Sequence, residues 1–127
     1  MKTYPGNFVL DPLGRRVPLH GKPAFAALHR AGAVAAACLD HIAPHILPGV
    51  TTGEIDERVA AFLKAEGAVA ATLGYHGFPA SCCISPNHVV NHGIPSGAVR
   101  LKAGDIVNVD VTAIVDGWHG DTSRMYL

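Results

Sequence analysis

An Asp116-Gly117 pair interrupts two alternating runs in VNVDVTAIVDGWHGDTSRMYL, which spans residues 107–127. A two-residue hairpin turn needs positive φ at both central positions, so Asp-Gly in this setting predicts a β-hairpin. With a loop of only two residues, Val115 lies opposite Trp118, and every later pair along the two strands is fixed in turn. The turn therefore determines both the local fold and the strand register.

This register places two carboxylates on one face, because strand side chains alternate between faces. Asp110 and Asp121 become diagonal neighbours, roughly 7–8 Å apart at the backbone, and such a pair is repulsive unless a proton or a cation lies between them. The same alternation also fits an amphipathic hairpin with its polar face in water. Because this face has no Lys, Arg or Glu, we expect a metal site instead. The polar face comprises Asn108, Asp110, Thr112, His119, Asp121 and Ser123.

Composition limits the class of protein. The 127 residues suffice for one domain with a hydrophobic core, and ten basic side chains balance ten acidic ones. This balance argues against direct binding to nucleic acid or to an anionic membrane. The three cysteines form neither a disulfide framework nor a CxxC pair, and we find no segment of signal-peptide or membrane-spanning character. A reducing, cytoplasmic location is the expectation.

Helical periodicity dominates the first half of the chain. Apolar residues recur every three or four positions from Pro23, which predicts a helix that ends or distorts near Pro44. Thr51 and Glu54 match a capping box, with Thr51 as the N-cap, and predict a second helix that runs to about Gly67.

The remaining segments are less regular. Residues 1–22 are rich in Pro and Gly and predict an irregular arm. After the second helix, short apolar segments predict extended chain at 68–72, 82–85 and 89–92, before the hairpin. Helices followed by strands favour an α+β fold with the helices on one face of an antiparallel sheet.

Two loops carry candidate functional side chains. Gly74–Pro79 holds aromatic residues between glycines and a proline, which suits either the wall of an apolar pocket or a buried turn. His92 precedes a Gly-Ile-Pro bend and is either a structural residue or a catalytic one. Cys83 has no obvious base nearby, which favours a small apolar filler over a nucleophile.

Two longer motifs, GYHGFPASCCISPNHVVNHGIP and LKAGDIVNVDVTAIVDGWHGDTSRM, resemble the type I methionine aminopeptidases of metallopeptidase family M24. The resemblance extends from about Pro23 to the last residue. It implies the N-terminal half of the pita-bread fold over residues 23–127, preceded by the arm at 1–22. It also implies removal of the initiator methionine from nascent proteins.

The resemblance assigns roles to individual residues. Asp110 corresponds to an aspartate that chelates one metal ion, and Asp121 to one that bridges two ions. His92 corresponds to a catalytic histidine that contacts the substrate amide, and Asn87 to a residue of a monovalent-cation site. The residues implied to bind the substrate methionine are Tyr75, His76, Phe78, Cys83 and His92.

The implied cofactors are two divalent metal ions, for which Co, Mn, Fe(II) and Zn are all compatible with carboxylate ligands. Such ions lower the pKa of bound water and polarise a carbonyl group. Two pocket positions depart from the common pattern: Thr72 stands where many members have cysteine, and Phe78 where many have tyrosine.

The family takes one further histidine and two further glutamates from its second half, whereas no His or Glu follows Asp121 here. The chain also stops within a predicted strand. We therefore expect a fragment that lacks the C-terminal half, with an incomplete metal site and no activity alone.

The expected partners are the N-terminal methionine of nascent peptides, near the ribosome, and the missing C-terminal half. The alternative hypothesis is a non-catalytic binding module of the same fold. A proline-specific peptidase of this fold is disfavoured by the GYHGFP loop.

Overall fold

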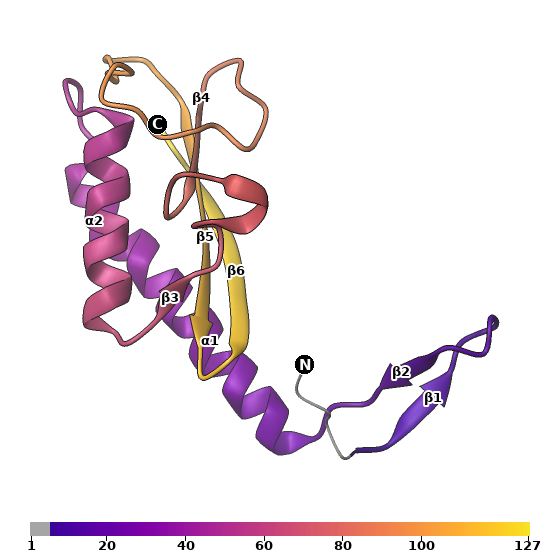
Figure 1. Ribbon diagram of the computed structural model, residues 1–127. Helices are drawn as coiled ribbons and strands as arrows, with labels where there is room; N and C mark the ends of the chain where they lie inside the picture. Colours follow the sequence, from indigo (N-terminus) through magenta and orange to yellow (C-terminus); the bar gives the residue numbers. More distant parts are fainter. Residues whose placement is uncertain (1–5) are drawn as a thin grey trace.

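The computed structural model describes residues 6–127, with two helices on one side of a small antiparallel sheet and a separate hairpin projecting from the body (Figure 1). The helices and strands are β1 (Phe8–Leu10), β2 (Arg16–Pro18), α1 (Lys22–Ile42), η1 (Ala43–His45), α2 (Thr52–Ala65), β3 (Val69–Ala70), η2 (Tyr75–Gly77), β4 (Cys83–Pro86), β5 (Val107–Val115) and β6 (Trp118–Tyr126).

Strand β5 is the centre of the main sheet. One of its edges pairs with β6 along the whole strand, and the other edge pairs with β4 and then with β3. All of these pairings are antiparallel. Asp110 lies opposite Ser123, and Thr112 lies opposite Asp121, so the predicted hairpin register is confirmed.

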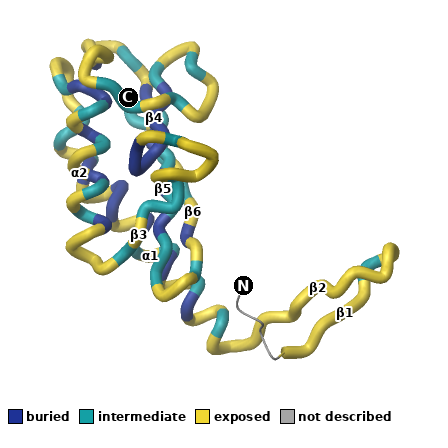
Figure 2. Tube along the Cα trace, in the orientation of Figure 1, coloured by how far each residue is buried: buried dark blue, intermediate teal, exposed yellow. Residues whose placement is uncertain are grey.

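The hydrophobic core lies between the helices and one face of this sheet. Alternate β5 residues, Val107 to Ala113, are buried, while the residues between them are only partly covered. Figure 2 shows this as buried segments where α1 and α2 meet the sheet, in contrast to the exposed arm. The largest buried side chains from the helices are Leu39, Ile42, Ile55, Val59 and Leu63.

Small residues bring α1 unusually close to β6. Gly120 faces α1, and a Cβ built on it would lie 2.2 Å from the carbonyl carbon of Ala31 and 2.3 Å from the amide nitrogen of Gly32. Two polar contacts fasten the same interface further along: Arg124 binds Asp40 at 2.7 Å, and the Tyr126 hydroxyl donates to the Leu39 carbonyl at 2.7 Å. The strand that carries Asp121 is therefore fixed against α1.

The capping box at the start of α2 is confirmed. The Thr51 hydroxyl accepts a hydrogen bond from the Glu54 amide at 3.1 Å, and the Glu54 carboxylate accepts one from the Thr51 amide at 2.7 Å. Without these acceptors, the amides of Thr51 and Glu54 would be unpaired donors at the helix N-terminus.

Replacing Thr51 with alanine is expected to lower the free energy of unfolding by about 1 kcal/mol, because the Glu54 amide loses its acceptor. Thr51→Ser, which keeps the hydroxyl, serves as the control. Urea denaturation followed by circular dichroism measures the difference. Equal stability of the alanine and serine variants would contradict a capping role for the hydroxyl.

Several predictions of regular structure were wrong or incomplete. Part of the arm is ordered as the β1–β2 hairpin, although residues 1–5 lie outside the described part. The segment 89–92 is not a strand, because His92 has φ of +54° and turns the chain. Phe25, one of the apolar residues that recur from Pro23, is 61% exposed and is not part of the buried face of α1.

None of the helices between residues 6 and 127 has the length and apolar character of a membrane-spanning segment.

Candidate active site

Asp110 and Asp121 lie on the sheet face that turns away from the helices. Both side chains are directed to this face by the alternation of β5 and β6, whose buried residues point to the core. Thr112 lies opposite Asp121, and its hydroxyl donates to Asp121 Oδ1 at 3.0 Å. This hydrogen bond orients one carboxylate of the pair.

A cleft of about 680 Å³ opens over this pair. Its volume is in the range of sites that hold a small ligand. The structure brings together every residue that the sequence suggested for the metal ions and the substrate. These cleft-lining residues are Tyr75, His76, Phe78, Cys83, His92, Asp110 and Asp121. Thr112, His119 and Ile94 also line the cleft.

The aromatic loop forms one wall of the cleft rather than a buried turn. Tyr75 is 68% exposed, and its ring contacts that of His76 edge-on with a centroid separation of 4.3 Å. Gly74, His76 and Gly77 all have positive φ, so the loop folds back on itself over a few residues. Its glycines meet a backbone requirement that other residues satisfy only with strain.

His92 reaches the cleft from a tightly packed bend. A Cβ on the adjacent Gly93 would lie 2.0 Å from the Ile84 carbonyl oxygen, so the bend rests directly on β4. The Gly93 amide donates to Ser85 Oγ at 3.0 Å, while its carbonyl accepts from the Ile84 amide at 2.9 Å. These contacts hold His92 at the cleft in a left-handed conformation that is costly for a non-glycine residue.

The electrostatics of the pair favour a cation. Burial raises the pKa of the Asp110 carboxyl, and the neighbouring Asp121 raises it further, while His92 acts in the opposite direction. The same environment raises the pKa of the Cys83 thiol, through burial first and then through Asp110 and Asp121. Cys83 therefore stays a neutral thiol near neutral pH, which agrees with a pocket-lining role and not with a nucleophile.

The raised pKa of Asp110 predicts a pH-dependent stability difference. A carboxyl whose folded pKa lies above its unfolded value penalises the folded state as pH rises through the folded pKa. Asp110→Asn is therefore expected to raise the melting temperature at pH 7 in the presence of a chelator. The gain should vanish at about pH 3, where the Asp110 carboxyl is protonated and as uncharged as asparagine. Thermal melts across this range test the prediction, and a pH-independent difference would contradict it.

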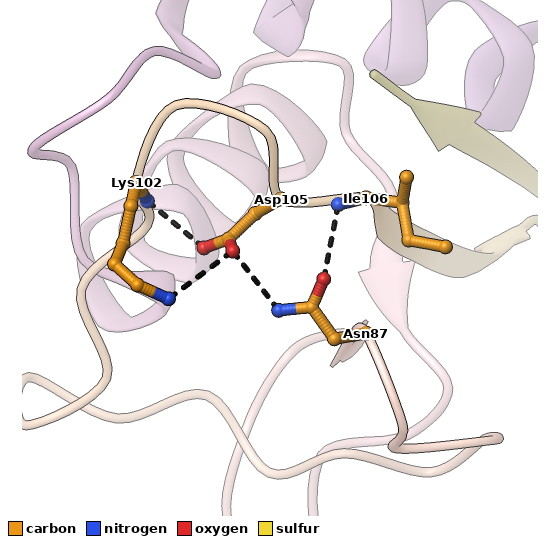
Figure 3. Close-up of polar contacts among 4 residues, drawn as sticks. All are labelled: Asn87, Lys102, Asp105 and Ile106. Carbon is orange, nitrogen blue, oxygen red and sulfur yellow. Dashed lines mark hydrogen bonds and ion pairs between the residues drawn. The ribbon is translucent and has the colours of Figure 1, made fainter.

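Asn87 lies apart from the carboxylate pair. It lines a second cavity, on the other side of His92, together with Asp105 and Lys102. Figure 3 shows its amide bridging two loops: Nδ2 donates to Asp105 Oδ1 at 3.0 Å, and Oδ1 accepts from the Ile106 amide at 3.2 Å. Lys102 also contacts Asp105, through its amide at 2.9 Å and its ammonium at 3.3 Å. The side chain of Asn87 thus ties the end of β4 to the start of β5.

The donor set fits one side of a divalent metal site. Asp110 and Asp121 supply hard oxygen ligands of the kind that Mn, Fe(II), Co and Zn accept. Within residues 6–127, however, no cluster of three or more His, Cys, Asp or Glu side chains is arranged to hold a metal ion. By themselves, the two carboxylates would supply only part of a coordination shell.

Sequence reasoning missed three contributors to this site. Gly120 and Gly93 act through close backbone approach to distant segments, and Asp56 acts through hydrogen bonds to residues 81 and 82. The only local signal for the two close approaches was a glycine next to a candidate residue, at His92-Gly93 and Gly120-Asp121. Asp56 had no such signal.

Comparison with known proteins defines the class first. The profile of metallopeptidase family M24 matches residues 26–127, which is most of the chain. The chain therefore belongs to metallopeptidase family M24.

More specifically, the chain is similar to methionine aminopeptidases. It is 56% identical over 98 residues to the methionine aminopeptidase of Escherichia coli (strain K12), covering 76% of this chain and 37% of that protein. Methionine aminopeptidase A of Synechocystis sp. is 49% identical over 114 residues, covering 90% of this chain and 45% of that protein. The crystal structure of methionine aminopeptidase from Rickettsia prowazekii superimposes with a TM-score of 0.84 at 49% identity, covering 87% of this chain and 44% of that one.

These comparisons confirm the predicted resemblance to methionine aminopeptidases and the α+β, pita-bread class of fold. The chain spans less than half the length of each of these relatives.

Proposed function

We propose that this chain carries one half of a methionine aminopeptidase active site: two metal-binding aspartates and the pocket for the substrate's methionine side chain. One observation carries the proposal. Asp110, Asp121 and the aromatic loop, which come from different segments, line the same cleft. A metal-dependent aminopeptidase needs this juxtaposition, because the ions act next to the residue that is removed.

The individual residues have distinct roles in this proposal. Asp110 and Asp121 hold divalent ions of the Co, Mn, Fe(II) or Zn type, and Thr112 orients Asp121. When bound, such ions lower the pKa of water and polarise the scissile carbonyl. His92 donates a hydrogen bond to the substrate amide from its position at the cleft.

The pocket accounts for the choice of side chain. Tyr75, His76, Phe78 and Cys83 surround space next to the carboxylate pair with mostly apolar surface. A long, unbranched, apolar side chain such as methionine suits these walls, and the neutral Cys83 thiol adds no charge. In the cell, the substrates are nascent proteins that begin with methionine, encountered in the cytoplasm near the ribosome. The monovalent-cation role of Asn87 is a separate part of the proposal, located in the second cavity.

A chimera tests the function without requiring activity from the 127-residue chain alone. Residues 26–127 would replace the matching segment of the Escherichia coli methionine aminopeptidase, to which the chain is 56% identical over 98 residues. We expect metal-dependent release of methionine from Met-Ala-Ser and little cleavage of Leu-Ala-Ser. Asp110→Ala should abolish the activity.

A folded chimera that binds metal but leaves Met-Ala-Ser intact would refute the proposal. It would favour the non-catalytic binding module in its place. The chain on its own is expected to be inactive because its coordination shell is partial. Robust hydrolysis of Met-Ala-Ser by the purified 127-residue chain would contradict that expectation.

A further inference from the structure

The aromatic wall of the cleft is fastened at its two ends by side chains outside the proposed catalytic set. At one end, the Thr72 hydroxyl donates to the Ala80 carbonyl at 3.1 Å and closes the loop across its base. At the other, Asp56 Oδ1 accepts hydrogen bonds from the Ser81 amide at 2.9 Å and the Cys82 amide at 3.0 Å. We call residues 73–79, between these contacts, the wall loop.

The wall loop has little burial of its own. Leu73 is 59% exposed and Tyr75 is 68% exposed, so apolar packing holds these side chains only weakly. Hydrogen bonds within the loop are local, such as Gly74 to Phe78 at 2.8 Å and Gly77 to Gly74 at 3.2 Å. His76, which has a φ of +48° without being glycine, adds strain that local contacts must offset. The two end contacts therefore decide whether the loop keeps one conformation.

Asp56 is well placed to act as an anchor, because it belongs to a rigid element. It lies on α2 next to Ile55, which is fully buried, and the capping box fixes the start of this helix. The residues it holds are themselves buried: Ser81 is 6% exposed and Cys82 is 0% exposed. A carboxylate that accepts from two consecutive backbone amides fixes the direction of the chain at that point.

Asp56 is also linked through the backbone to the side of the cleft that carries Asp110 and Asp121. Immediately after Cys82, strand β4 begins with Cys83, which pairs with Asp110 on β5. Asp56 therefore sets the position of the wall loop relative to the carboxylate pair. Thr72 closes the loop onto the same segment through Ala80.

We propose that Asp56 and Thr72 are positioning residues that latch the wall loop over the cleft and thereby set the shape of the side-chain pocket. The identity of the side chain that fills the pocket rests on the proposed function, whereas the latching of the loop does not. Asp56 is not among the residues that line the cleft, so its effect passes through Tyr75, His76 and Phe78, which do line it. Thr72 lies at the edge of the cleft lining and also closes the base of the wall loop through Ala80.

Amide hydrogen exchange of the 127-residue chain tests the latch directly. Asp56→Ala leaves the buried amides of Ser81 and Cys82 without their acceptor. Because this releases one end of the wall loop, we expect the wall-loop amides to exchange about 100-fold faster. Thr72→Val removes one hydrogen bond and should accelerate the same amides about 5-fold. Amides of β5 should keep their wild-type exchange rates.

Matched variants separate the latch from a general loss of stability. Asp56→Asn keeps an acceptor oxygen and Thr72→Ser keeps the hydroxyl, so both should restore slow exchange. Glu57→Ala changes the exposed neighbour of Asp56 on α2 and should have no effect. If Asp56→Ala accelerates β5 as much as the wall loop, or if Thr72→Val leaves the wall loop unchanged, the proposal is overturned.

A second measurement addresses the pocket. L-methioninamide is titrated into the isotopically labelled chain, and Co²⁺ binding is measured in parallel. Asp56→Ala should weaken binding of L-methioninamide about 10-fold or more and leave Co²⁺ affinity unchanged; Thr72→Val is not used in this comparison because Thr72 itself lines the cleft. Equal loss of both ligands would contradict a positioning role. Failure of the wild-type chain to bind L-methioninamide would count against the proposed function, while the exchange rates would still decide the latch.

Discussion

Replacing Gly120 with alanine is expected to destabilise the protein by about 3 kcal/mol or more, a large effect for one added methyl group. The new Cβ would lie 2.2 Å from the backbone of Ala31, so α1 and β6 would have to separate. Neither partner can yield easily, because the contact is with helix backbone and not with the end of a flexible side chain. Urea denaturation of the two proteins measures the loss.

Gly32→Ala is the matched control for this prediction. Gly32 lies on α1 at the same interface, yet a Cβ built on it would meet no atom within 4 Å. A helical Gly-to-Ala change of this kind is expected to stabilise by up to about 1 kcal/mol. If both substitutions had the same effect, the close approach of β6 to α1 would not be the cause.

Gly120 also explains part of the geometry of the site. It is the inward-facing residue between His119 and Asp121, both of which point to the cleft side. Because Gly120 and its cross-strand partner Ala113 are small, α1 can rest against this part of the hairpin. The helix thus supports the backbone directly beneath the proposed metal ligand.

The features that the sequence predicted correctly are encoded locally. The Asp116-Gly117 turn sets the hairpin register by itself, and the Thr51–Glu54 capping box is complete within four residues. Once the register is known, the convergence of Asp110 and Asp121 follows from strand alternation alone. The position of this carboxylate pair was therefore the most predictable part of the candidate site.

The features that the sequence did not predict depend on contacts between distant segments. Asp56 binds residues 25 and 26 positions further along the chain, and its role has no local signature on an ordinary helix. The bend at His92 looked extended in sequence, but Gly93 rests on the backbone of Ile84 and turns the segment. Hydrophobic periodicity describes one helix or strand at a time, so it does not predict contacts between distant segments of this kind.

The second large effect concerns metal binding. Asp121→Ala is expected to lower the affinity of the chain for Co²⁺ by at least about 100-fold, because loss of an outer-shell partner alone typically costs 10- to 100-fold. Thr112→Val removes the hydrogen bond that orients Asp121 and should cost about 10-fold. The two variants should differ in size of effect because Asp121→Ala removes the proposed ligand, whereas Thr112→Val keeps the carboxylate and removes only the hydrogen bond that orients it.

Isothermal titration with Co²⁺ at neutral pH measures these differences, and Asp116→Asn provides the control. Asp116 is an exposed aspartate at the tip of the same hairpin, and asparagine also tolerates its φ of +50°. The control changes the net charge by the same amount as Asp121→Ala and should leave Co²⁺ affinity unchanged. A similar loss of Co²⁺ affinity in Asp116→Asn and Asp121→Ala would mean that the cation responds to general negative charge. A loss confined to Asp121→Ala would locate the cation at the Asp110–Asp121 pair.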